Sequence, residues 1–530
     1  MRAPLLLTLA AIATMAPAAS QDLTINEIGL YQGVDDYLLH GIDGNIAAYS
    51  FATTACNVGD QPVEWSYVLG TAPILGKNAF RIIDGRIEQI GYSFVKYGGC
   101  ANDIQDSTCG TCQPTPGDCT LGIGCADIYW STVNDGKYGY GKWELDPVTG
   151  SWPIGGPQDT PTGSGTIRGR VQIDLNDFSD PSALYIVEGQ YIAQDDHLAG
   201  NAENDYAWRQ VGVDASFQMT SAGPSIPGQP AIYAWQALAN DVHVVATPVI
   251  DEGGPGVHGW IWVGSRAIDL GGGEWRYEYA IQNGNSGRAV GSFGMKIPCD
   301  GSFNLSDDAY RGVLHHSGSP YLSEPWSFLN VSDQLLWRSA PYASNPDASA
   351  LRWGELGSFG FTCNRPPVMG KASVGLFTPG TPTSVSAEVF VPSGDFPSYC
   401  TANANSTGVP AQLSALGSPH VEHEALSFEV TDLPTSSFGY FLMSQSTTFV
   451  PLFGGSQGNL CVGAPQIRFS GNVLFSGSAG EVGFDVDFDN LPQGLQFMPG
   501  DAWNFQYWYR DVNPSPTSNT TAGVTVTFCP

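Results

Sequence analysis

The chain has 530 residues, of which 51 are acidic and 21 basic, and its formal net charge is −30 at pH 7. With 42% hydrophobic and only 14% charged residues, it has the composition of a folded protein rather than a disordered one. The 65 glycines and 37 prolines follow no three-residue period, which excludes collagen. A nucleic-acid partner is excluded, because such binding depends on clustered Lys and Arg. The length suggests three or four domains, each able to bury a core.

The first twenty residues have the pattern of a secretory signal peptide. Arg2 gives a basic start, an apolar stretch runs over residues 5–13, and small residues precede the polar Gln21. This apolar stretch is too short to span a bilayer, and no later segment approaches eighteen consecutive apolar residues. We therefore expect residues 1–20 to be removed and the rest to be secreted, extracellular or at the cell surface, with no membrane span.

Cysteine use agrees with an oxidising compartment. Six of the eleven cysteines lie between residues 56 and 125, in a Gly-, Pro- and Asp-rich region that is poor in core residues, so disulfides are predicted there. Zinc is the weaker alternative, because the Cys109–Cys112 pair is not followed by a second pair of the same spacing. A pairing of Cys299 with Cys363 is also predicted, and the odd number leaves one cysteine over. The disulfide candidates are Cys56, Cys100, Cys109, Cys112, Cys119, Cys125, Cys299, Cys363, Cys400 and Cys461.

The hydrophobic pattern along the chain is that of β-strands. Alternating apolar and polar residues at 168–174, 185–192 and 483–488 predict strands, and two more at 260–268 and 275–282, separated by three glycines, predict a hairpin. Sustained helical periodicity is missing after the signal peptide. We expect an all-β protein of several β-sandwiches or jelly rolls that are cross-linked by disulfides. Pro-rich stretches at 220–231 and 391–398 act as linkers between a Cys-rich domain (21–225), a second domain (232–395) and a third (399–530).

A dense set of oxygen donors follows the strand predicted at 185–192. Calcium binds six to eight oxygens from a flexible loop, and this segment offers the side chains of Asp195, Asp196, Asn201, Glu203 and Asp205. Two interpretations stay open, a calcium site and a solvated acidic loop, since charge runs are often only the latter. Calcium is the one cofactor that the sequence suggests.

Several motifs resemble a known family. GRIEQIG at 85–91, GQYIAQDD at 189–196, GSQGNLC at 455–461 and WNFQYWYRD at 503–511 resemble an uncharacterised family of secreted proteins from planctomycetes and related environmental bacteria. The resemblance spans nearly all of the mature chain and implies no assigned activity. It also implies histidines before Pro73 and after Lys96, whereas this chain has Ala72 and Tyr97. A site built on those two histidines would be lost here.

The strand at 503–510 presents two different faces. One face carries large aromatic residues and is expected in a core, while the other carries Gln506, Trp508 and Arg510. An indole beside amide and guanidinium donors suits stacking on a sugar ring, although a neighbouring strand would equally explain this face. We expect a non-catalytic binding or structural protein that contacts an extracellular glycan or protein surface, in adhesion or in a matrix. The alternative is an extracellular hydrolase of polysaccharide or polyester with its active site in the first domain.

Overall fold

The computed structural model describes residues 20–117, 119–155, 161–314 and 318–530. Nearly all of the expected signal peptide lies outside these residues. The regular structure of the described residues is mainly antiparallel strand, with two short α-helices, α1 (Gln194–Ala199) and α2 (Ile232–Leu238). Five 3-10 helices of one turn complete it: Lys142–Glu144, Leu175–Phe178, Val421–His423, Phe453–Gly455 and Pro492–Gly494. The expected all-β class is therefore confirmed. No helix in these ranges has the length and apolar character needed to cross a membrane.

The N-terminal unit (residues 20–227) is organised around one six-stranded sheet. Its order is β10-β8-β14-β15-β16, with β9 paired to β8. Two three-stranded sheets, β1-β6-β12 and β13-β5-β4, and two short ribbons, β2-β3 and β11-β7, complete the unit. The strand bounds are β1 (Leu23–Ile28), β2 (Leu30–Tyr31), β3 (Val34–Asp35), β4 (Tyr37–Asp43), β5 (Ile46–Phe51), β6 (Thr53–Asn57), β7 (Val63–Glu64), β8 (Ile74–Ile83), β9 (Arg86–Tyr92), β10 (Lys96–Tyr97), β11 (Thr120–Leu121), β12 (Ala126–Tyr129), β13 (Val171–Asp174), β14 (Leu184–Ile192), β15 (Tyr206–Val213) and β16 (Met219–Pro227).

The middle unit (residues 232–392) packs two five-stranded sheets on each other, in the orders β17-β20-β21-β26-β23 and β24-β25-β22-β27-β28. Tyr277, Tyr279 and Ile281 alternate into the shared core, and β20 and β21 form the hairpin expected from the sequence. The strands are β17 (Val242–Ala246), β18 (Val249–Gly254), β19 (Val257–Gly259), β20 (Ile261–Gly271), β21 (Glu274–Asn283), β22 (Val290–Lys296), β23 (Leu305–Arg311), β24 (Ser327–Val331), β25 (Gln334–Arg338), β26 (Glu355–Cys363), β27 (Pro367–Leu376) and β28 (Ser384–Pro392).

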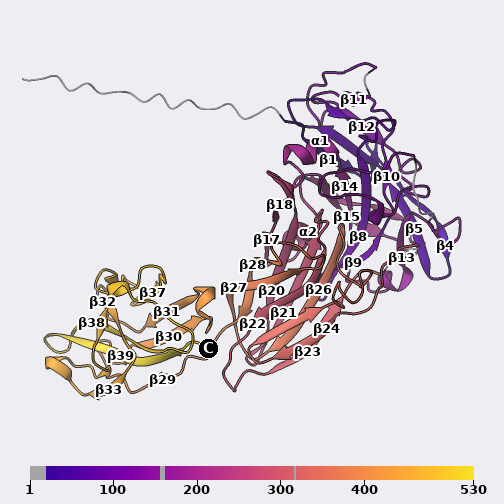
Figure 1. Ribbon diagram of the computed structural model, residues 1–530. Coiled ribbons are helices and arrows are strands. Elements are labelled where there is room, and N and C mark those ends of the chain that lie inside the picture. The colour runs from indigo at the N-terminus through magenta and orange to yellow at the C-terminus, as the bar shows by residue number, and fades with distance from the viewer. Residues whose placement is uncertain (1–19, 118, 156–160, 315–317) are drawn as a thin grey trace, which may run out of the picture.

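The C-terminal unit (residues 396–530) packs the sheet β29-β39-β38-β32-β35, with β36 paired to β32, against the sheet β30-β31-β37. Figure 1 shows this orange and yellow unit beside the end of the middle unit. Its strands are β29 (Ser398–Tyr399), β30 (Gln412–Gly417), β31 (Leu426–Thr431), β32 (Phe438–Ser444), β33 (Thr447–Val450), β34 (Leu460–Val462), β35 (Ile467–Arg468), β36 (Leu474–Phe475), β37 (Val482–Asp485), β38 (Ala502–Val512) and β39 (Pro516–Thr527).

The segment 220–231, expected to be a linker, is instead mostly strand β16 followed by the entry to α2. β16 pairs with β15 at the edge of the large sheet. Pro224 and Pro227 are tolerated there because an edge strand has one side without ladder partners. Beyond it, α2 buries Ile232 and Trp235 in a core to which both the N-terminal and the middle unit contribute side chains, Phe80 and Trp262 among them. These two units therefore share a hydrophobic core.

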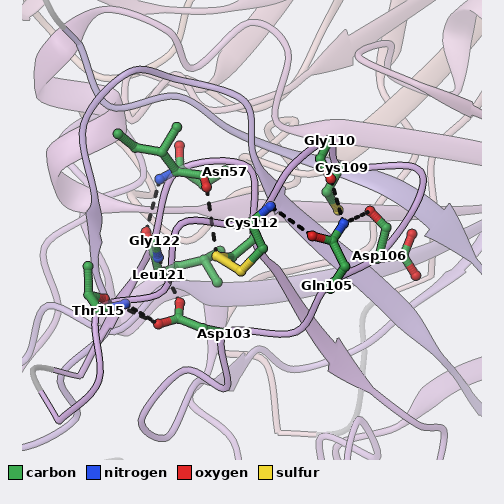
Figure 2. Close-up of a disulfide and its surroundings, with 12 residues drawn as sticks. Asn57, Asp103, Gln105, Asp106, Cys109, Gly110, Cys112, Thr115, Leu121 and Gly122 are labelled. Carbon is green, nitrogen blue, oxygen red and sulfur yellow. Dashed lines mark hydrogen bonds between the residues drawn. A yellow bond between two sulfur atoms is a disulfide. The ribbon is translucent and has the colours of Figure 1, made fainter.

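Disulfides join ten of the eleven cysteines. The N-terminal cysteines pair as Cys56–Cys109, Cys100–Cys119 and Cys112–Cys125, and the C-terminal unit contains Cys400–Cys461. Figure 2 shows the Cys112 region, where the loops are held by polar bonds: the Cys112 amide donates to Gln105 Oε1 (3.0 Å) and the Gly122 amide to Asp103 Oδ1 (2.8 Å). Five disulfides are typical of proteins outside the cytoplasm.

The expected Cys299–Cys363 pairing is wrong. Cys299 pairs with Cys529, which lies 230 residues away, and Cys363 is a buried free thiol at the end of β26. This bridge crosses from the middle unit to the end of the C-terminal unit. It is accompanied by His420, whose Nε2–H donates to the Ile297 carbonyl (2.7 Å), and by an ion pair of Lys296 with Glu422 (2.8 Å).

Candidate functional site

The acidic segment 195–205 is not the open loop that the sequence suggested. Residues 194–199 form α1, which ends at Gly200 in the left-handed conformation (φ 90°), and the chain then turns into β15. Three of the five expected calcium ligands are directed elsewhere or exposed. Asp195 Oδ2 accepts from the Glu64 amide (2.7 Å), Asn201 Nδ2 donates to the Gln21 carbonyl (2.6 Å), and Glu203 is exposed. The five side chains therefore do not form the oxygen cage that calcium requires.

Two of the expected ligands do meet, together with a histidine. Potential ligand atoms of Asp196, His197 and Asp205 all lie within 4.8 Å of one another, and the three side chains are buried. His197 Nε2 lies 2.9 Å from Asp205 Oδ2, and its Nδ1 lies 3.1 Å from the Val148 carbonyl. We call these three residues the buried acidic cluster.

Burial controls the protonation of the buried acidic cluster. It raises the pKa values of Asp196 and Asp205 well above the usual range, and the proximity of the two carboxyl groups raises that of Asp196 further. Burial also lowers the pKa of His197. With the carboxyl pKa values raised, the three groups hold protons between them, so that little net charge is buried.

The outer face of the C-terminal sheet carries a second group of chemically distinctive side chains. In β38, Trp503, Phe505, Tyr507 and Tyr509 lie in the core, as the alternation predicted. On the opposite face Trp508 is half-buried, with its ring 5.0 Å from that of Tyr440 in β32, and the Arg510 guanidinium lies 5.2 Å from the Trp508 ring.

The same outer face continues across β32 to β36. Phe438 is 54% exposed and Phe475 50% exposed, and their rings lie 4.8 Å apart. We call Phe438, Tyr440, Phe475 and Trp508 the aromatic strip. Its members come from three adjacent strands, β36, β32 and β38, so the strip follows the direction of sheet pairing.

Gln506 does not belong to this exposed face, which corrects the expectation for it. It is fully buried: its Nε2 donates to the carbonyls of Asn459 (2.8 Å) and Thr521 (2.7 Å), and its Oε1 accepts from the Cys461 amide (2.9 Å). Residues 459–462 fold over this end of β38 and satisfy the amide. On this face of β38, Arg510 is exposed and Trp508 is half-buried.

The two positions where the family resemblance implies histidines lie close together. The Gly98 amide donates to the Pro73 carbonyl (2.9 Å), and Trp152 Nε1 donates to the carbonyl of Ala72 (3.0 Å) while its ring stacks on Tyr97 (5.7 Å). Tyr97 also stacks on Tyr67 (5.0 Å). In this chain Ala72 and Tyr97 stand at these two positions, and the rings of Tyr67 and Trp152 pack against Tyr97.

Sequence reasoning missed His197 as a partner of the acidic residues, and missed Phe438, Tyr440 and Phe475. His197 carries a usable signal, because it is adjacent to Asp196. Phe438 and Tyr440 are two residues apart and so share a strand face, but their register with Trp508 is set by the pairing of β32 with β38.

Comparisons with known proteins give no family. No family model and no curated protein matches the chain. Among solved structures it is similar to the full-length major pilin SpaD from Corynebacterium diphtheriae, at 9% identity and a TM-score of 0.18, over 87% of this chain and 84% of that one. It is also similar to the major pilin subunit BcpA of Bacillus cereus, at 6% identity and a TM-score of 0.17, over 71% of this chain and 88% of that one. TM-scores this low provide no basis for transferring a function.

Proposed function

We propose that the chain is an exported, non-catalytic protein whose C-terminal unit binds a neutral polysaccharide outside the cell through the aromatic strip. The observation that carries this proposal is the open row of rings on the outer sheet face, with Tyr440 and Trp508 in contact and Phe438 and Phe475 about half exposed. A contiguous row of exposed aromatic rings is unfavourable in water, and such patches on soluble proteins usually mark a site that a ligand or partner covers.

The chemistry of the strip suits sugar rings. Carbohydrate faces that carry axial C–H bonds pack on aromatic rings, and polar groups at the edge fix their orientation. Arg510 is exposed beside Trp508, and among the described residues no carboxylate forms a salt bridge with it. Its guanidinium can therefore donate to sugar hydroxyl groups.

Charge favours a neutral polymer over an anionic one. The net charge of −30 repels polyanions over the range of the Debye length, and the single Arg510 does not reverse that field. Export is supported by the five disulfides, which require an oxidising compartment, and by the leader pattern of residues 1–20.

The test is retention of the full chain on insoluble neutral polysaccharides, such as cellulose and xylan, with anionic alginate beads for comparison. The Trp508→Ala variant should bind about tenfold more weakly, which corresponds to roughly 1.4 kcal/mol. Because the Trp508 ring packs on Tyr440 and is only partly exposed, the substitution should also lower the melting temperature, so retention is measured well below the melting temperature of the variant. Trp130→Ala is the matched control, since Trp130 is a 44% exposed tryptophan in the N-terminal unit.

Two results would refute the proposal. One is that none of the neutral polymers retains the wild-type chain. The other is that Trp508→Ala and Trp130→Ala lower retention equally. Retention on alginate alone would contradict the charge argument.

A further inference from the structure

We propose that Asp196, His197 and Asp205 bind one divalent transition-metal ion, for which Zn²⁺ is the appropriate probe. The inference is independent of the proposed polysaccharide binding, which concerns the other end of the molecule. It starts from two buried carboxyl oxygens, Asp196 Oδ2 and Asp205 Oδ1, to which no described residue outside the cluster donates a hydrogen bond. Only a proton shared within the cluster or a bound cation can satisfy them. Buried polar atoms are nearly always satisfied, so each such atom calls for an explanation.

The histidine is oriented as a metal ligand would be. A carbonyl oxygen only accepts, so His197 Nδ1 must carry the hydrogen that is donated to the Val148 carbonyl (3.1 Å). In the neutral ring this leaves the Nε2 lone pair directed toward Asp205 Oδ2 (2.9 Å), which in the metal-free chain carries the proton that joins the two atoms. A backbone carbonyl that holds the second ring nitrogen is the usual outer-shell support of a metal-bound histidine.

The donor set selects the class of ion. Two carboxylate oxygens and one imidazole nitrogen suit Zn²⁺ and related ions at about 2.0–2.2 Å, whereas Ca²⁺ takes six to eight oxygens. Two ionised carboxylates also balance the charge of a divalent ion, which removes the cost of burying a net charge. The ion would replace the shared protons of the cluster and open the His197–Asp205 contact slightly.

The position of the cluster gives the ion a structural role. Asp196 and His197 lie on α1, Asp205 immediately precedes β15, and Asp196 Oδ1 accepts from the Leu23 amide at the start of β1 (2.9 Å). Coordination would therefore connect α1, the first residues of β15 and the beginning of the first strand. A buried site of this kind is loaded as the chain folds.

The experiment uses the full chain secreted into medium that contains Zn²⁺ and passed through gel filtration in metal-free buffer. Elemental analysis should find one zinc per chain, and removing the zinc with a chelator should lower the melting temperature. Asp196→Asn keeps the oxygen that accepts from Leu23 but removes the charge, and it should abolish zinc retention; Asp205→Asn is a second variant with the same expectation. Glu203→Gln is the matched control, because Glu203 is exposed in the same segment, and it should retain zinc.

Loading with cobalt adds a spectroscopic measurement that reports metal coordination directly rather than through stability. Secretion in the presence of Co²⁺ should give visible absorption bands of a low-coordinate site with nitrogen and oxygen ligands in the wild-type chain and in Glu203→Gln, and these bands should be absent in Asp205→Asn. The proposal is overturned if the folded wild-type chain contains no zinc, or if Asp196→Asn and Glu203→Gln retain equal amounts. Either result would show that the cluster holds only shared protons.

Discussion

Lys77 lies in the middle of β8 with its side chain 0% exposed and, among the described residues, no hydrogen-bond partner for its Nζ. Burial lowers its pKa from 10.5 to about 7, opposed in part by the charge of Asp135. The unfolded chain therefore binds more protons than the native chain between about pH 7 and 10.5, so this lysine makes stability rise with pH across that window.

The magnitude follows from the two pKa values. At about pH 7 the buried lysine lowers the free energy of unfolding by about 4 kcal/mol. At about pH 9.5 it lowers it by only about 1.5 kcal/mol, because the lysine of the unfolded chain is then also losing its proton. Lys77→Met keeps an unbranched side chain of similar length and removes the charge. The variant should therefore be more stable than the wild type, by up to about 4 kcal/mol near neutral pH, and its advantage should shrink as the pH rises.

Guanidinium unfolding with the disulfides intact, followed by tryptophan fluorescence between about pH 7 and 9.5, measures this difference. Lys371→Met is the control, since Lys371 is exposed in β27, and it should change the unfolding free energy little at any pH. The reasoning would be refuted if Lys77→Met were less stable than the wild type throughout, or if its advantage did not depend on pH.

Two further predictions concern the cysteines. Replacing Cys299 by Ser removes the bridge to Cys529 and should destabilise the chain by about 4–5 kcal/mol, because the bridge closes a long loop; a guanidinium midpoint equal to that of the wild type would contradict this. Burial raises the pKa of the Cys363 thiol to about 12, so iodoacetamide should label the native chain at neutral pH very slowly and should label one thiol once the chain is unfolded, as counted by intact mass. Rapid labelling of the native chain would show that Cys363 is accessible.

Local patterns in the sequence were sufficient to predict the fold class. Alternation with a period of two, interrupted by glycine turns, predicts strands because successive side chains of a strand point to opposite sides. The hairpin of β20 and β21 illustrates this, with the alternating Tyr277, Tyr279 and Ile281 buried on one face. The core face of β38 was predictable for the same reason.

The segment 220–231 shows where local composition misleads. Its prolines and glycines predicted a linker, but the edge position of β16 leaves one side of the strand without partners, and prolines are acceptable there. Whether a strand lies at the edge of a sheet depends on which strands pair, and that information is not local.

The candidate sites depend even more on contacts between distant residues. Cys299 meets Cys529 rather than Cys363, Gln506 is buried because residues 459–462 fold over it, and Tyr440 reaches Trp508 only through the register of β32 with β38. A carboxylate becomes a candidate ligand only when other donors converge on it and water is excluded. At Asp196 this requires Asp205, Val148 and Leu23 to come together in space. The sequence by itself determined the strands, the oxidising environment and the residue types available, and the tertiary structure alone decided which of them meet, because pairing, burial and coordination depend on distances in space rather than on spacing along the chain.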